Sequence, residues 1–130
     1  MTLRKISTAG APPPFSRYSQ AIEVPAGQKL VFVSGQVGID LEGNMAPTAK
    51  GQHEQTWVNI LAILEDAGLG PHDIVEITCY ITDADGVATT REVRDSFLDG
   101  AEPASTLLVI SGLAHPDWKV EISVVAAGPA

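Results

Sequence analysis

The sequence predicts one α+β domain, spanning residues 1–130, in which two helices cover one face of a β-sheet. The length is that of one domain, and a hydrophobic content of 45% is enough to fill one core. Two stretches have helical periodicity, and each lies between runs of strand-like composition. The expected element order is therefore β-β-α-β-α-β-β.

The N-terminal part of the chain predicts a connector and a hairpin. Residues 9–14 read A-G-A-P-P-P, and consecutive prolines remove backbone donors and favour an extended path. Two β-rich runs follow at residues 21–24 and 29–37. The P-A-G-Q between them is typical of a hairpin turn, so we expect these two strands to pair with each other.

Both helices have recognisable ends. The first is expected from about Thr48 to Ala67, with Gly68 just beyond it. Its apolar side chains recur at i, i+3, i+4 and i+7, namely Trp57, Ile60, Leu61 and Leu64. The second is expected from near Asp85, which can cap it, to Leu98.

The remaining strands alternate between apolar and polar side chains. Residues 73–82 do so, residues 118–127 do so again, and between them Pro103 precedes an apolar run that ends at Ile110. Two helices on one face of a sheet of five or six strands leave the other face uncovered. That face is partly polar and partly apolar, which suggests contact between subunits.

Charge and composition exclude several classes of protein. The net charge of −8 repels phosphate backbones, so nucleic acid is not an expected partner. No apolar stretch reaches the roughly 18–20 residues of a membrane span, and the N-terminus lacks the apolar segment of a signal peptide. A single cysteine fits a reducing compartment. We therefore expect a cytoplasmic protein without membrane contact.

The sequence offers no metal or cofactor motif. His53, His72 and His115 lack the spacing of metal ligands, so no metal site is expected. The glycine-rich stretches do not match phosphate-binding loops, and no cofactor is expected either. Cys79 lies on the apolar face of its strand, which favours an inert buried thiol over a nucleophile.

A few polar residues are candidates for a site. Glu121 lies between Val120 and Ile122 inside a strand, so its carboxylate is either solvated or held in a pocket. Tyr18 is a loop residue that could equally anchor the loop, and Ser34 could be a turn hydroxyl at a strand end. None of these residues indicates a function alone.

Together, in this order, the motifs resemble the YjgF/RidA family of reactive intermediate deaminases, also called endoribonuclease L-PSP-like proteins. The resemblance runs from about Arg17 to Ala126, and its segments are S-R-Y-S-Q-A, V-F-V-S-G-Q-V, L-E-D-A-G-L, D-I-V-E-I-T-C-Y-I-T-D, P-A-S-T-L-L-V and V-E-I-S-V-V-A. The S-G-Q tripeptide and the V-E-I strand are its most specific parts.

The resemblance implies a chorismate-mutase-like α+β fold, with a mixed sheet and both helices on one face. It implies a homotrimer with small-molecule clefts between subunits. In deaminating members these clefts hydrolyse enamines and imines to 2-oxo acids and ammonia, with no metal or organic cofactor. Ribonuclease activity, ascribed to some relatives, is disfavoured by the acidic charge.

The resemblance also implies the site. By position Glu121 is the catalytic residue, and Tyr18, Ser34 and Thr106 bind the substrate. The deaminating members hold the substrate carboxylate with an arginine in R-S-[CT], but aligning that motif on A-S-T places Ala104 there. Arg17 is expected to replace it, with Arg91 as a weaker alternative. Two functions stay open: an imine deaminase with altered or lost activity, and a non-catalytic module that binds a small metabolite.

Overall fold

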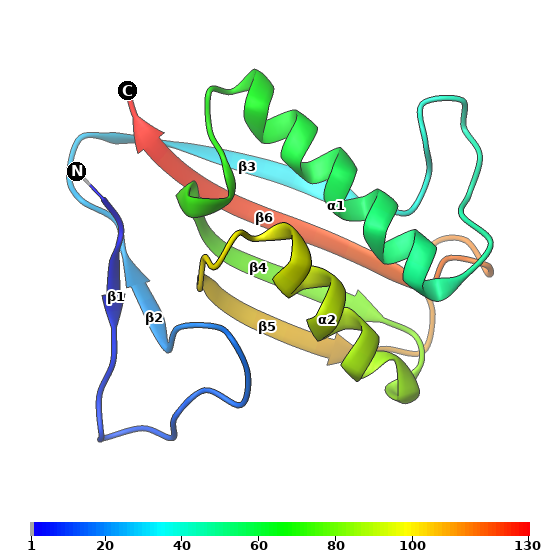
Figure 1. Ribbon diagram of the computed structural model, residues 1–130, viewed down its shortest axis with the longest axis horizontal. Coiled ribbons are helices and arrows are strands. Elements are labelled where there is room, and N and C mark those ends of the chain that lie inside the picture. The colour runs from blue at the N-terminus through cyan, green and yellow to red at the C-terminus, as the bar shows by residue number, and fades with distance from the viewer. Residues whose placement is uncertain (1) are drawn as a thin grey trace.

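Both helices lie on one face of a four-stranded sheet of order β3-β6-β4-β5 (Figure 1). The computed structural model describes residues 2–130. Within them the sheet strands are β3 (Gln28–Gln36), β4 (Ile74–Ile81), β5 (Ala104–Val109) and β6 (Val120–Pro129). The helices are α1 (Ala49–Asp66) and α2 (Val87–Phe97), with short 3-10 turns at Pro71–Asp73 and Ala84–Gly86. The predicted α+β architecture is confirmed.

The sheet is mixed because its two kinds of connection differ. Strand β6 pairs antiparallel with β3 on one side and with β4 on the other. Strands β4 and β5 are parallel, and α2 provides the crossover that parallel neighbours require. The last strand in the chain therefore lies in the middle of the sheet.

The predicted hairpin of residues 21–24 and 29–37 is wrong. Strand β2 (Ala21–Glu23) pairs antiparallel with β1 (Arg4–Ile6), in a separate two-stranded ribbon that the sequence analysis missed. Strand β3 pairs with β6 instead, because β6 buries its own apolar side chains on the same face. The described sheet consequently has four strands, not five or six.

The helix ends follow local hydrogen bonding. Thr48 caps α1 by accepting from the Gly51 N–H at 3.0 Å, and Gly68 adopts φ +76° beyond its end. The cap predicted at Asp85 is wrong, because a 3-10 turn precedes α2. Asp83 caps that turn instead, by accepting from the Asp85 N–H at 2.9 Å.

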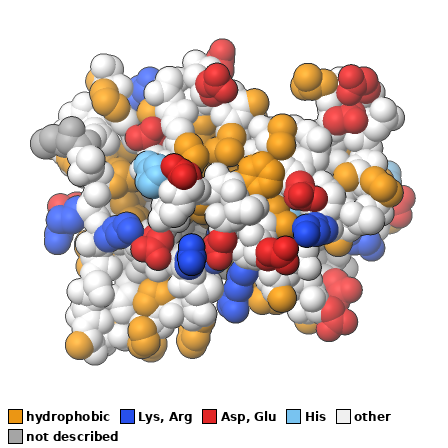
Figure 2. Space-filling view, in the orientation of Figure 1, with side chains coloured by type: hydrophobic (Ala, Val, Ile, Leu, Met, Phe, Trp, Pro, Cys, Tyr) orange, Lys and Arg blue, Asp and Glu red, His pale blue; other side chains and the backbone are white. Residues whose placement is uncertain are grey.

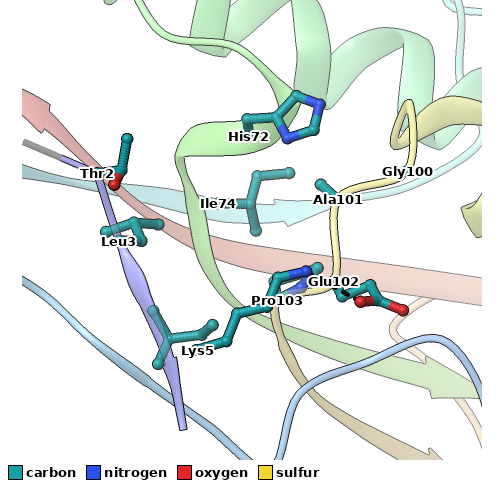
Figure 3. Close-up of a pocket in the computed structure, with 10 residues that line it drawn as sticks. Thr2, Leu3, Lys5, His72, Ile74, Gly100, Ala101, Glu102 and Pro103 are labelled. Atoms are coloured by element: carbon teal, nitrogen blue, oxygen red, sulfur yellow. Dashed lines mark hydrogen bonds and ion pairs between the residues drawn. The ribbon is translucent and has the colours of Figure 1, made fainter.

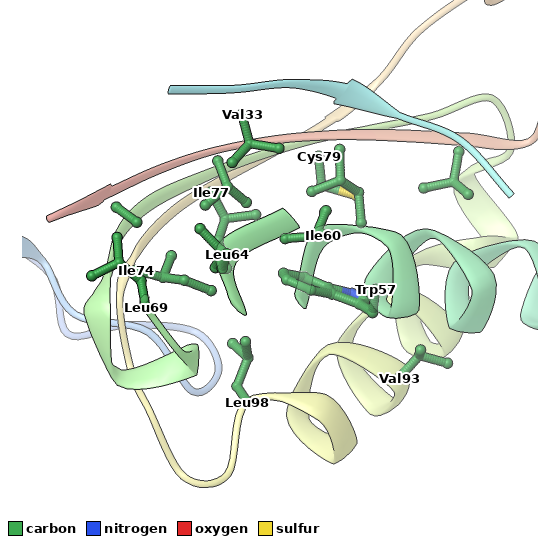
Figure 4. Packing of buried hydrophobic residues seen from close by; sticks show 14 of the residues in the cluster. Val33, Trp57, Ile60, Leu64, Leu69, Ile74, Ile77, Cys79, Val93 and Leu98 are labelled. Atoms are coloured by element: carbon green, nitrogen blue, oxygen red, sulfur yellow. The ribbon is translucent and has the colours of Figure 1, made fainter. Parts of the chain in front are cut away.

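The core lies between the helices and the sheet (Figure 4). Trp57, Ile60 and Leu64 of α1 pack against the inward-facing side chains of β4 and β6, which include Ile77 and Ile122. Cys79 is part of this cluster, and burial raises the pKa of its thiol to about 12. The burial of Cys79 expected from the sequence is confirmed.

A buried histidine joins the two helices. The His53 ring is 2% exposed; its Nδ1 lies 2.9 Å from the Ala49 carbonyl oxygen and its Nε2 lies 2.8 Å from the Thr90 Oγ1. Burial lowers the pKa of His53, because the charged ring would lose its hydration. The neutral ring is therefore the form that the fold favours.

The helix-covered surface carries no block of one charge. Figure 2 shows acidic and basic side chains interspersed there with apolar ones. Within residues 2–130, no helix has both the length and the apolar character needed to cross a bilayer.

Candidate functional site

The sheet face opposite the helices carries most of the predicted site residues. Strand register sets them in rows, because paired residues point to the same face. One row contains Ser123, Thr78 and Thr106, and the next contains Glu121, Tyr80 and Leu108. We call this surface the open face. Glu121 points to it because Val120 and Ile122 point into the core.

The Glu121 carboxylate lies against the backbone of Gly35. A Cβ built at Gly35 would be 2.8 Å from the Glu121 Cδ, which is too close for any real side chain. The register of β3 shifts between Val33 and Gln36, so Ser34 and Gly35 form an irregularity in the strand. The structure thereby brings Glu121 together with the S-G-Q motif.

The surroundings of Glu121 leave its oxygens available. The residue is half-buried, and within residues 2–130 no protein group donates a hydrogen bond to it. Ser34 is exposed and its backbone carbonyl accepts from the Gln36 amide at 3.2 Å. Thr106 is exposed on β5, two strands away from Glu121. Within one chain, Ser34, Glu121 and Thr106 therefore lie on three strands that extend from the β3 edge of the sheet through its middle to the β5 edge.

Ala104 lies on the open face beside an acid. Its partner on β4 is Glu76, and Glu76 in turn pairs with Val125 on β6. The Thr78 hydroxyl donates to the Glu76 carboxylate at 2.6 Å, which holds that carboxylate on the same face. The open-face positions of β4, β5 and β6 named here include two acids and no base. None of these open-face positions therefore supplies the arginine that the resemblance leads us to expect.

Tyr18 lies elsewhere, at the outer edge of β5. It lines a hollow of about 160 Å³ with Arg91 and Arg94 of α2 and with Ser105. Ser105 points to the helix-covered side of β5, since Thr106 points to the open face. Within one chain, this hollow contains neither Glu121 nor Ser34.

The two predicted replacements for the arginine are also apart from Glu121. Arg17 is exposed in the loop beside Tyr18, and no ion pair involves it within residues 2–130. Arg91 lies on α2, on the helix-covered side of the sheet. The role predicted for Arg17 stays a prediction.

Sequence reasoning missed Arg94. Its side chain is 8% exposed, its Nε donates to the Asp95 carboxylate at 3.0 Å, and its Nη2 donates to the Ser16 hydroxyl at 3.2 Å. The helical spacing could have indicated that Arg94 is buried, because it follows Thr90 by four residues and so lies on the same face of α2, which is the buried face.

Another hollow, of about 200 Å³, lies between β1 and the turn before β5 (Figure 3). The Lys5 and His72 side chains that line it already have partners. Lys5 donates to Glu102 at 2.9 Å, and the His72 ring contacts the Asp99 carbonyl oxygen at 3.0 Å. Across residues 2–130, no group of three His, Cys, Asp or Glu side chains lies close enough to hold a metal ion.

Comparison with known proteins gives a consistent result. The sequence model of the endoribonuclease L-PSP family matches residues 8–128. A RutC family protein of Aquifex aeolicus is 39% identical over 95% of this chain and 98% of its own length. The mouse 2-iminobutanoate/2-iminopropanoate deaminase is 31% identical over 95% of this chain and 91% of its own.

A solved structure agrees with these sequence matches. The Rid-family protein YyfB of Yersinia pestis superposes with a TM-score of 0.87, at 26% identity, over 97% of this chain and 98% of that one. The chain therefore belongs to the endoribonuclease L-PSP family, which is the YjgF/RidA family that its motifs resemble.

Proposed function

We propose that this chain forms a homotrimer whose clefts between subunits hydrolyse small enamines and imines to 2-oxo acids and ammonia. The observation that carries the proposal is the Glu121 carboxylate, half-buried against Gly35 and free of protein donors within residues 2–130. Relatives named 2-iminobutanoate/2-iminopropanoate deaminase support the reaction class.

The trimer is supported by apolar side chains on the open face. Phe32 is 73% exposed, Leu30 is 51% exposed and Leu108 is 44% exposed, and all three point away from the helices. Leaving this much apolar surface in water is unfavourable, whereas a second copy of the chain would cover it. Clefts along such an interface would contain Glu121, Ser34 and Thr106, with Tyr18 and Arg17 reaching in from the loop at the β5 edge.

Glu121 supplies the proton transfers that imine hydrolysis needs. The carboxylate accepts a proton from a water molecule as the water oxygen bonds to the imine carbon. The same proton then passes to the nitrogen. Glu121 next accepts the hydroxyl proton of the carbinolamine and delivers it to the amine nitrogen. Collapse then breaks the carbon–nitrogen bond, forms the carbonyl and releases ammonia. No electron acceptor takes part in these steps.

Ala104 favours a second function, the binding of a small metabolite without turnover. Glu76 and Glu121 both lie on the open face, so a substrate carboxylate there would meet two like charges and no arginine of β4, β5 or β6. An uncharged or cationic ligand would avoid this repulsion. In this function Glu121 accepts a hydrogen bond from the ligand and transfers no proton.

A coupled assay separates the two functions. A threonine dehydratase generates the imine, and release of the 2-oxo acid is followed with and without this protein. Deaminase function predicts an accelerated release that Glu121→Gln abolishes and Glu54→Gln, an exposed acid of α1, leaves unchanged. No acceleration by a correctly folded trimer would exclude the deaminase and leave the binding function. A monomer mass by light scattering at micromolar concentration would overturn both.

A further inference from the structure

The turn between α2 and β5 holds its two central residues in the left-handed region of backbone conformation. Asp99 has φ +51° and Gly100 has φ +79°. Across them, the Ala101 N–H donates to the Leu98 carbonyl oxygen at 2.9 Å. Successive positive φ angles are those of a type I′ turn, in which Asp–Gly is a favoured pair. Within residues 2–130, Asp99 is the one residue other than glycine that has a positive φ.

This turn leaves the backbone nitrogen of Gly100 free. The hydrogen bond that closes the turn uses the N–H of Ala101, and within residues 2–130 the Gly100 N–H donates to no other group. Because Gly100 has no side chain, nothing of its own hinders an approach to that nitrogen. The Asp99 side chain is 85% exposed. An unbonded amide nitrogen therefore directly follows an accessible carboxyl group.

His72 contacts two oxygens of Asp99. The ring nitrogen Nε2 lies 3.0 Å from the Asp99 backbone carbonyl oxygen and 3.4 Å from its Oδ2, and the ring points towards the turn that carries Gly100 (Figure 3). The carbonyl and the ionised carboxylate only accept, so Nε2 carries the hydrogen. A hydrogen bond donated to the carbonyl oxygen makes the carbonyl carbon easier for water to attack, because it stabilises the charge that develops on the oxygen.

We propose that Asp99 is a site of spontaneous modification, at which the peptide bond to Gly100 isomerises to an isoaspartyl bond through a succinimide, with His72 as hydrogen-bond donor. The Gly100 nitrogen bonds to the Asp99 Cγ, and its proton leaves with the carboxyl OH as one water molecule. Water then adds to the Asp99 backbone carbonyl carbon and breaks its bond to the nitrogen. The OH stays on that carbon as a new α-carboxyl group, and the other hydrogen returns to the nitrogen. The water lost in the first step is regained in the second, and no electron is transferred.

The other Asp–Gly pair of the chain lacks this arrangement. Asp85 and Gly86 lie in the 3-10 turn before α2, where the Gly86 N–H donates to the Asp83 carbonyl oxygen at 2.9 Å. That nitrogen is already engaged, and within residues 2–130 no histidine makes a hydrogen bond or ion pair with Asp85. The same dipeptide thus occurs in two environments within one molecule, which provides an internal comparison.

The competing explanation is that Asp99 and Gly100 serve only to close the turn. Leu98 is 1% exposed and anchors the turn in the core, and Asp and Gly tolerate a positive φ better than most residues. A turn with that role alone would hold the carboxyl group and the nitrogen in place, so the folded chain would react more slowly than the unfolded one. Neither residue belongs to the cleft of the proposed hydrolysis, so this inference stands independently of that function.

The test follows isoaspartate in the full chain by peptide mapping and mass spectrometry, during incubation at neutral pH and physiological temperature. A protein isoaspartate methyltransferase, which methylates the new α-carboxyl group, quantifies the product. In the folded protein, isoaspartate at Asp99 should accumulate about tenfold faster than at Asp85, because reaction at Asp85 must first break a hydrogen bond. In urea, where neither turn persists, the two sites should react at similar rates.

Two variants assign the site and the role of the histidine. Asp99→Gly suits the positive φ and should abolish the product at this position while leaving Asp85 unchanged. His72→Ala, at an exposed position, should slow the reaction at Asp99 severalfold and leave Asp85 unchanged. Equal rates at Asp99 and Asp85 in the folded protein, or a faster reaction of Asp99 in urea than in the folded chain, would overturn the proposal. An unchanged rate at Asp99 in His72→Ala would do so too.

Discussion

The Glu121 carboxylate lies directly over the Cα of Gly35, in the space that a Cβ at that position would fill. The strand irregularity at Ser34 and Gly35 therefore leaves the space that the Glu121 carboxylate occupies. Of the two open-face carboxylates named above, Glu76 accepts a hydrogen bond from Thr78, whereas Glu121 has no donor within residues 2–130. A side chain at position 35 would have to displace Glu121.

Gly35→Ala is expected to lower activity without unfolding the protein. The added methyl group meets the flexible end of Glu121, which can rotate away at a cost of about 1 kcal/mol. Displacement of the carboxylate by about 1 Å would then reduce kcat by up to about a hundredfold. The coupled assay and thermal unfolding measure the two effects.

Gly112→Ala is the control for that substitution, because a Cβ there meets nothing within 4 Å. It should retain full activity. Equal activity of Gly35→Ala and wild type would show that the position of Glu121 is not critical for turnover.

Ala104→Arg is expected to raise kcat/KM for imines of 2-oxo acids, and the gain should depend on Glu76. A bidentate arginine–carboxylate contact is worth about 2–5 kcal/mol, but Glu76 lies across the strand pair and would compete for the new guanidinium. Adding Glu76→Gln frees the arginine, so the double variant should exceed the single one. The coupled assay gives the three values of kcat/KM.

Circular dichroism spectra should show that both variants keep the fold. If neither variant exceeds wild type while the fold is retained, the absent guanidinium does not limit the reaction.

His53 is expected to make stability fall in mild acid. Burial lowers its folded-state pKa below the unfolded value of about 6.5, so the unfolded chain takes up a proton first as the pH falls. The stabilisation is complete above about pH 6.5 and is lost as the pH falls towards the folded-state pKa. Urea unfolding at several values between about pH 8 and about pH 5 measures the slope of the unfolding free energy against pH.

His53→Gln should reduce that slope, because the titrating ring is removed. It should also lower the unfolding free energy near pH 8 by about 1–3 kcal/mol, because the buried hydrogen bonds of the ring with Ala49 and Thr90 are lost. An unchanged slope in His53→Gln would place the pH dependence in another group.

Cys79 should resist thiol reagents in the native state. It is 3% exposed, and burial raises its pKa to about 12, so the reactive thiolate is scarce at neutral pH. Labelling followed by mass spectrometry should show modification only in denaturant, at a rate set by unfolding. Rapid labelling of the folded protein would mean that β4 opens locally.

The sequence predicted those features that repeat along one element. Alternation placed Glu121 on the face opposite Val120 and Ile122, and helical spacing placed Trp57 in the core. The pairing of β1 with β2 could not be predicted, because the three residues of β1 are too few to show alternation of apolar and polar side chains. Their register also depends on a strand that is distant in the sequence.

The candidate site was predictable only in part, for a similar reason. Motifs identified Tyr18 and Glu121 by their order in the chain, but the hollow around Tyr18 depends on how α2 packs over β5. Arg94 belongs to that packing. The role of a charged residue at a buried helix position depends on the side chains that it contacts, and for Arg94 these include Ser16, which is distant in the sequence.

The central position of β6 has a consequence for synthesis on the ribosome. Both strands that pair with it, β3 and β4, emerge before Val120 does, and each lacks its main partner until then. The nascent chain therefore exposes two apolar strand edges for as long as the intervening residues take to be made. Such edges are prone to intermolecular pairing, so we expect nascent chains stalled before β6 to recruit chaperones that bind extended apolar segments.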